Sequence, residues 1–119
     1  MARTALAVTD VPFQSGIANI SFTAVDQPNG NKFDNDGNTI LIVKDTGGGN
    51  CTVTVRAVAD EAGRSVDLVL VVPLTTGIGI MGPFRAQWWN QRAAPDVGAV
   101  GVDFSTGTGV TAAALRLKD

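Results

Sequence analysis

Hydrophobic and polar residues alternate with a period of two along the middle of the chain. In the stretch TVTVRA, residues 52–57, threonine and arginine fall on one parity while valine and alanine fall on the other. This pattern is typical of a strand with one buried face. A second apolar run at 66–73 repeats the alternation after the polar turn DEAG at 60–63, which predicts an antiparallel hairpin. A third run closes at 82–84, so we expect a β-meander at the centre of the protein.

Further strands are predicted on both sides of this meander. Residues 17–25 alternate as a half-buried strand does, and the continuous run ILIV at 40–43 indicates a central strand covered on both faces. Two last strands are expected at 97–105 and 110–117. The polar segment DQPNGNKFDNDGN, residues 26–38, contains two strong turn signals and predicts a long surface loop or a hairpin tip.

The chain of 119 residues is expected to be one all-β domain, residues 1–119. Eight to nine strands with a turn about every 8 to 12 residues favour a single-domain antiparallel β-sandwich or a small barrel, jelly-roll-like in layout. Residues 3–9 alternate weakly and predict either a first strand or an extended N-terminal arm within 1–12. Such an arm is either a frayed terminus or a segment that docks on a partner. Charged residues make up 17% of the sequence, against about 25% in an average globular chain. This deficit indicates that some of the surface is covered in use.

Charge and composition exclude several classes of function. The chain has no histidine, which removes Ser-His-Asp, Cys-His and His-ligated metal chemistry, so we expect no enzyme activity and no cofactor. The net charge is −2 and the nine Lys and Arg are scattered, which argues against a nucleic-acid partner. We read no signal peptide and no membrane span. The lone Cys51 is expected to serve as a small buried apolar residue.

Two segments superficially match ligand-binding motifs. The sequence DNDGN at 34–38 begins like an EF-hand calcium loop, but neither the glycine nor the final glutamate that such a loop needs is in place. We interpret it as a turn and expect no metal. The sequence GIGIMG at 77–82 contains G-x-G-x-x-G but runs into a proline instead of a helix. We therefore assign it to strand glycines that permit close packing or a bulge.

The pair Trp88-Trp89 is the most informative candidate for an interface. Adjacent residues on a strand point to opposite faces, so one ring can enter the core while the other points outward. Either loop 91–96 shields the second ring or the ring anchors a partner, and an outward tryptophan beside Phe84 would make such an anchor.

An ordered set of short motifs resembles a group of small proteins encoded near the major capsid gene of tailed bacteriophages. The similarity spans about residues 39–117 and rests on strands rich in valine, a Gly-Pro-Phe close and a Val-Asp-Phe-Ser strand. These motifs are Leu41-Ile42-Val43, Val53-Thr54-Val55-Arg56-Ala57, Asp67-Leu68-Val69-Leu70-Val71-Val72-Pro73, Met81-Gly82-Pro83-Phe84, Val102-Asp103-Phe104-Ser105, and Gly109-Val110-Thr111 to Leu115-Arg116-Leu117.

The resemblance implies a virion structural protein without catalytic residues. We expect a capsid decoration, or cement, protein that is made in the host cytoplasm, binds the major capsid protein on the outside of the head and associates with copies of itself, with a trimer suspected. Main-chain hydrogen bonds from a sheet edge or the terminal arm, and anchors from Phe13, Phe84, Trp88 or Trp89, are the expected contacts. A head-tail connector or tail component is the alternative, and a carbohydrate-binding module is the rival of another class.

Overall fold

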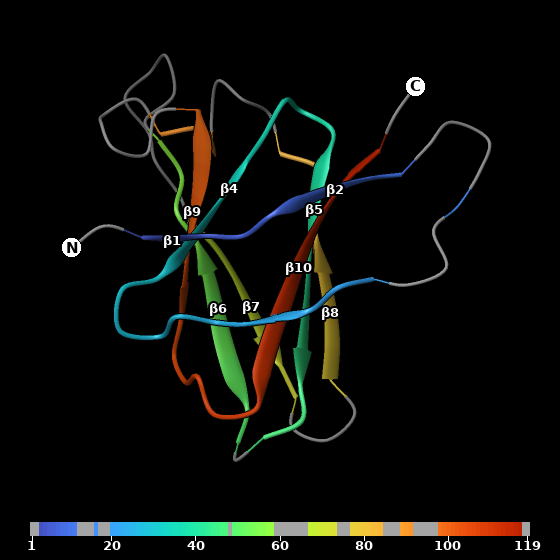
Figure 1. Ribbon diagram of the computed structural model, residues 1–119. Coiled ribbons are helices and arrows are strands. Elements are labelled where there is room, and N and C mark those ends of the chain that lie inside the picture. Colours follow the sequence, from blue (N-terminus) through green and yellow to red (C-terminus); the bar gives the residue numbers. More distant parts are fainter. Residues whose placement is uncertain are drawn as a thin grey trace.

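The apolar segments of the chain become ten short strands, which pack as a β-sandwich in the computed structural model (Figure 1). The structure describes residues 3–11, 16, 20–47, 49–58, 67–73, 77–84, 89–91 and 98–117. The strands are β1 (Thr4–Ala5), β2 (Val8–Val11), β3 (Thr23–Ala24), β4 (Asn31–Asp34), β5 (Thr39–Asp45), β6 (Cys51–Val55), β7 (Leu68–Val72), β8 (Gly77–Met81), β9 (Ala99–Phe104) and β10 (Val110–Leu117).

The strands form two five-stranded sheets, which we call sheet A and sheet B. Sheet A has the order β1-β4-β9-β6-β7, and sheet B has the order β2-β10-β5-β8, with β3 also paired to β10. The all-β class and the sandwich are therefore confirmed, and neither sheet closes into a barrel. The expectation of antiparallel sheets is wrong at two places, because β1 runs parallel to β4 and β2 runs parallel to β10.

The hairpin predicted around the polar turn is confirmed. Strands β6 and β7 pair antiparallel with Val53 opposite Leu70, and the valines of β6 are buried while its threonines are only partly covered. The predicted meander is wrong, however, because β8 pairs with β5 in sheet B. The chain crosses from one layer to the other after β7, a step that strand periodicity alone does not reveal.

The segment predicted as a polar loop contains a strand of sheet A. Strand β4 pairs with β9, and its Asn31 and Phe33 side chains are buried. The Asn31 side chain is satisfied in place, since its Oδ1 accepts a hydrogen bond from the Asp26 amide at 2.8 Å and its Nδ2 donates to the Thr4 carbonyl at 3.1 Å. Because its hydrogen bonds are satisfied, this asparagine can be buried in a strand whose polar composition otherwise predicts a loop.

Strand β5 lies in the middle of sheet B, between β10 and β8. Its Leu41 and Val43 side chains have no exposed surface and Ile42 has little, which confirms the strand predicted to be covered on both faces.

Cys51 is also buried, as expected. The rest of the core between the sheets is mainly valine, leucine, phenylalanine and alanine from β4, β6, β9 and β10.

The N-terminal segment joins the two sheets on one side of the sandwich. Strand β1 adds to the edge of sheet A beside β4, and β2 adds to the edge of sheet B beside β10. Leu6 lies between these strands and is buried in the core. Of the two alternatives for the N-terminus, the described residues 3–11 therefore form strands. Strand β3 crosses the same side (Figure 1) and covers less than the predicted 17–25, of which 17–19 lie outside the described residues.

Candidate interaction surface

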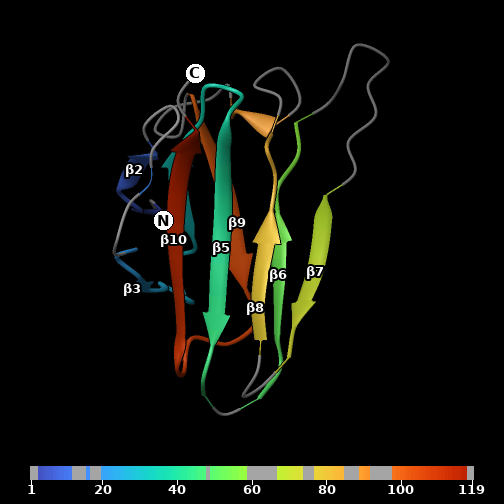
Figure 2. The same cartoon turned by 90° about the vertical axis from the view of Figure 1, so that its right-hand side faces the viewer.

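The side of the sandwich opposite the N-terminal strands is formed by β7 and β8. These strands end sheet A and sheet B respectively, and no other described strand pairs with their outer edges. In Figure 2 they lie at the right of the molecule, away from β2 and β3. We call this side the rim and define it as β7 and β8 with their outward side chains Val69, Val71, Ile78 and Ile80. These side chains are 53 to 62% exposed.

The outward residues of β7 are as apolar as its inward residues. Val72 is buried and Leu70 is partly buried against the core, so the alternation of a strand places Val69 and Val71 on the outer face of sheet A. Their neighbours on β6 are Thr54 and Thr52. Strand β7 therefore contains no polar face.

Strand β8 has the reverse of the usual pattern, with glycine inside and isoleucine outside. A Cβ on Gly79 would lie 3.0 Å from side-chain atoms of both Leu70 and Val72, so Gly79 faces the interior and lets β8 approach β7 closely. This confirms the interpretation of the glycines as packing residues. By alternation Ile78 and Ile80 point outward from sheet B, and both are more than 60% exposed.

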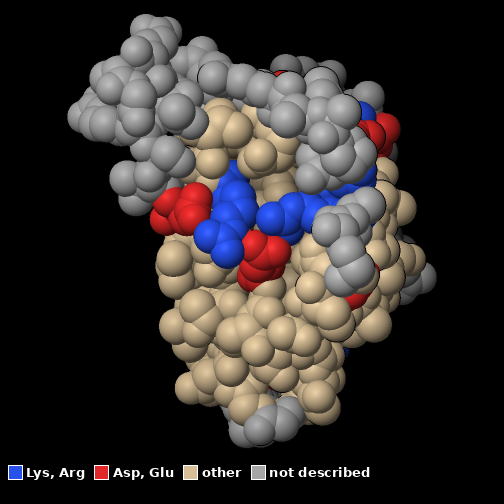
Figure 3. All heavy atoms as spheres, turned by 90° about the vertical axis from the view of Figure 1, so that its left-hand side faces the viewer, with Lys and Arg blue, Asp and Glu red and all other residues tan. Residues whose placement is uncertain are grey.

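Charged side chains are absent from β7 and β8. On the outer face of sheet A the described acidic and basic residues lie together in the upper half of the view in Figure 3. Most of the surface below them is uncharged. Edge strands of soluble proteins are commonly protected by charged side chains, proline or bulges. The five residues of each rim strand include none of the charged or proline residues that would serve this purpose.

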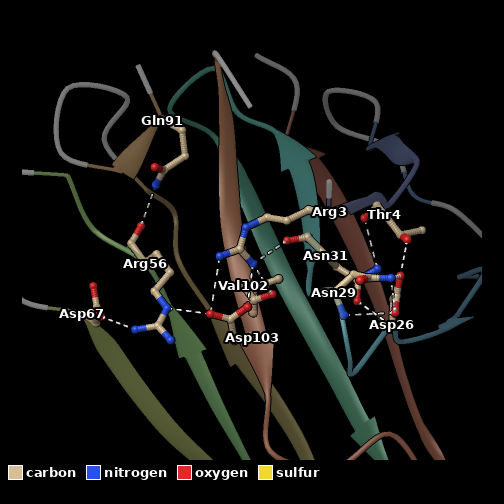
Figure 4. A network of polar contacts seen from close by, with 10 residues as sticks. All are labelled: Arg3, Thr4, Asp26, Asn29, Asn31, Arg56, Asp67, Gln91, Val102 and Asp103. Carbon is tan, nitrogen blue, oxygen red and sulfur yellow. Dashed lines mark hydrogen bonds and ion pairs between the residues drawn. The ribbon is translucent and has the colours of Figure 1, made fainter. Parts of the chain in front are cut away.

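The charges above the uncharged area form one continuous network (Figure 4). Asp103 on β9 accepts a hydrogen bond from Arg3 Nη1 at 2.7 Å and another from Arg56 Nε at 2.6 Å. Arg56 also donates to Asp67 at 2.9 Å, and Arg3 donates to the Val102 carbonyl at 3.0 Å. The network therefore connects the N-terminal segment to the residue that precedes β7.

Two glycines leave the space that Arg3 occupies. A Cβ on Gly101 would lie 2.9 Å from Arg3 Nε, and a Cβ on Gly30 would lie even closer to its guanidinium. Gly30 also has a φ of 79°, which favours glycine. The Arg3 side chain thus lies directly on the backbone of sheet A and fixes the start of β1.

The ion pairs change the ionisation of their members. Burial alone would raise the pKa of Asp103, but the hydrogen bonds from Arg3 and Arg56 outweigh it and hold that pKa below the ordinary value. The hydrogen bonds to Asp103 and Asp67 raise the pKa of Arg56. At neutral pH Asp103 is therefore ionised between two arginines. Its ion pairs hold β9 to the N-terminal segment and to the segment that follows β6.

Two of the four interface residues expected from the sequence, Phe84 and Trp89, lie within the described residues, and neither is an exposed ring. The Phe84 ring is buried and packs against Phe33, with ring centroids 5.9 Å apart. This corrects the expectation of an exposed Phe84 anchor, because the apolar ring fills space in the core between the two sheets. Trp89 is partly buried and meets Phe84 edge-on at 5.3 Å. Phe13 and Trp88 lie outside the described residues.

The DNDGN segment works as a turn in the structure. The Asn35 side chain accepts a hydrogen bond from the Gly37 amide and donates one to the Phe84 carbonyl, while Asp36 accepts a hydrogen bond from the Asn38 amide. Within the described part of the chain no group of three or more Asp, Glu, Cys or His could hold a metal ion. No helix among the described residues is long and apolar enough to cross a membrane.

The rim is the feature that reasoning from the sequence missed. The sequence does contain an indication of it. In LVLVV the residues on both faces of the strand are apolar, and in GIGIM isoleucine alternates with glycine, which has no side chain to bury. Comparisons with protein-family models, curated proteins and solved structures found no match to this chain.

Proposed function

We propose that the chain is a virion structural protein, a capsid decoration protein that binds the outer surface of a major capsid protein lattice in a tailed bacteriophage and stabilises the head. The single observation that supports this role best is the rim. Four aliphatic side chains are more than half exposed on β7 and β8, whose outer edges no described strand pairs with. Such a surface is typical of a protein that works while covered by another protein.

The distribution of charge supports the same role. The rim strands carry no charge, and the arginine and aspartate side chains of sheet A neutralise one another within their own network. The uncharged area of this face can therefore contact another protein without leaving an unpaired charge buried. A repeated lattice adds avidity, which raises an effective affinity by about 10² to 10⁴ when several contacts form together.

Binding to intact heads tests this proposal. Purified chain is incubated with heads of the phage that encodes it, and the copies retained per particle are counted on a quantitative gel. Decoration predicts copies on the order of hundreds, spread over the shell. A single ring of about six or twelve copies at one vertex would instead indicate a connector or tail component. No retention on heads or tails would contradict a structural role in the virion.

A further inference from the structure

The geometry of the β7 edge points to a second copy of this chain as its partner, and we propose that two copies pair through β7 to form a two-fold symmetric dimer. The inference rests on the proposed function only in that it assigns the self-association expected of a decoration protein to β7. It leaves Ile78 and Ile80 of β8, which point outward from sheet B, for the lattice. It can be tested without any capsid.

The backbone of β7 supplies the first argument. Among the described strands β7 pairs only with β6, along one edge, so its other edge can take an added strand. Figure 2 shows β7 as the outermost strand of sheet A on this side. An identical antiparallel strand would continue sheet A from one copy into the other.

The register of that pairing follows from symmetry. Full overlap of two five-residue strands places Leu70 opposite Leu70 of the second copy, on the two-fold axis, and Val69 opposite Val71. Val69 and Val71 of both copies would then form a cluster of four valines on the outer face. Aliphatic cross-strand pairs of this kind stabilise sheets.

Self-complementarity is the second argument. A two-fold contact brings each surface against itself, so any charge on the rim would face a like charge nearby. The rim strands carry none. Asp67 precedes β7, but its carboxylate is held by Arg56 at 2.9 Å and accepts the Ala57 amide at 2.9 Å. This carboxylate is therefore directed toward β6 and away from the free edge.

The size of the rim sets the expected strength of the dimer. Val69 and Val71 lie on the outer face of sheet A, while Ile78 and Ile80 point outward from sheet B, so pairing through β7 covers only part of the rim. We expect such a partial contact to bury less than the roughly 1,200–2,000 Å² found in stable interfaces. We therefore expect a dimer that dissociates on dilution, with a Kd on the order of 1–100 µM. A two-fold contact closes at two copies, so the suspected trimer would need a different surface.

Sedimentation of the full chain over a range of concentrations tests the inference. The wild type should shift from monomer to dimer as concentration rises, and Val71→Lys should weaken dimerisation at least tenfold by placing a charge on the apolar edge. The matched control is Leu117→Lys, which puts the same charge on an exposed aliphatic position of β10 outside the rim. This control should dimerise like the wild type.

Cross-linking tests the register even where a lysine variant folds poorly. A mixture of Val69→Cys and Val71→Cys chains should form a mixed disulfide on oxidation, because these positions are opposite in the proposed pairing. Each variant alone should cross-link much less. Native Cys51 is buried, so we expect only the introduced thiols to react.

A wild type that stays monomeric up to about 1 mM, or a dimer or trimer unaffected by Val71→Lys, would overturn the inference. If the monomeric wild type still decorates heads, the rim faces the lattice and only this inference fails. If the dimer forms but heads retain no copies, the proposed function fails while the dimer stands.

Discussion

The two open sides of the sandwich differ in how their edge strands are covered. On one side the N-terminal segment adds β1 to β4 and β2 to β10, and Leu6 is buried between the sheets. On the other side the outer edges of β7 and β8 have no described strand beside them, and these strands expose Val69, Val71, Ile78 and Ile80. The same sandwich therefore has one side that its own chain closes and one side that is left for another protein.

This difference indicates which side of the sandwich is open to association with another protein. Unpaired edges promote association unless they are protected, and this chain uses residues 3–11 and the partly buried Arg3–Asp103 ion pair to protect one side only. Glycines on the inner face of β8 bring the rim strands together and leave the isoleucines outside. The exposed apolar surface is thus a consequence of how the sheets pack.

The largest expected effect comes from deleting residues 1–11, which would make the covered side resemble the rim. The deletion removes β1, β2, the buried Leu6 and the Arg3 ion pair. We expect a loss of about 3–5 kcal/mol in the free energy of unfolding, together with association through the newly exposed edges of β4 and β10. Urea unfolding and light scattering measure both effects. A truncated chain that is as stable and as monodisperse as the full chain would refute the protective role of this segment.

A methyl group inside the rim should be the next most damaging change. A Cβ on Gly77 would lie 1.9 Å from the Pro73 carbonyl oxygen, so Gly77→Ala should push β8 away from the end of β7 and cost about 2–3 kcal/mol of unfolding free energy. The control is Gly49→Ala, because nothing lies within 4 Å of a Cβ there. Equal thermal midpoints for the two variants would show that the close approach of the rim strands is unimportant.

Acid should lower the stability of the covered side by protonating Asp103. Its pKa is lower in the folded chain than the ordinary value of 3.8, so its contribution is present above about pH 4 and is lost as pH falls through the folded pKa. We expect Asp103→Asn to cost about 1–2 kcal/mol at pH 7, a range reduced by the partial exposure of the pair. Below the folded pKa the difference from the wild type should shrink. Unfolding curves measured from pH 7 to 2 check this, and a difference independent of pH would exclude the charge as its cause.

Some of this organisation could be predicted from the sequence. The alternation at 52–57, the apolar run at 40–43 and the glycines at 77–82 correctly indicated strands, because burial on one or both faces leaves a direct periodic signal. Strand β4 was missed because Asn31 is buried with its hydrogen bonds satisfied by backbone groups of Asp26 and of Thr4 on β1. The assignment of β8 to sheet B was missed because periodicity does not specify pairing partners.

The candidate surface was harder to predict than the fold. Aromatic residues suggested anchors at Phe84 and Trp89, but the structure uses Phe84 as a core ring and packs Trp89 against it. Exposure of Val71 or Ile80 depends on which face of each sheet is turned outward. That is set by contacts between residues far apart in sequence, such as Gly79 with Leu70.

The smallest expected effect separates stability from association. Ile80→Lys in the rim and Leu117→Lys outside it both change a side chain that is at least 45% exposed. Each should shift the free energy of unfolding by no more than about 0.5 kcal/mol when measured on dilute, monomeric protein. A large loss of stability for Ile80→Lys alone would mean that this side chain supports the monomer and is not reserved for a partner.

Amide hydrogen exchange, followed at low and high protein concentration, tests the central claim most directly. If the rim is a surface that protein covers, exchange in β7 should slow at least severalfold as concentration rises, because its free edge gains hydrogen-bonded partners. Exchange in β1 and β2 on the covered side should stay unchanged. Equal exchange in β7 at both concentrations, with or without a head lattice present, would contradict the account.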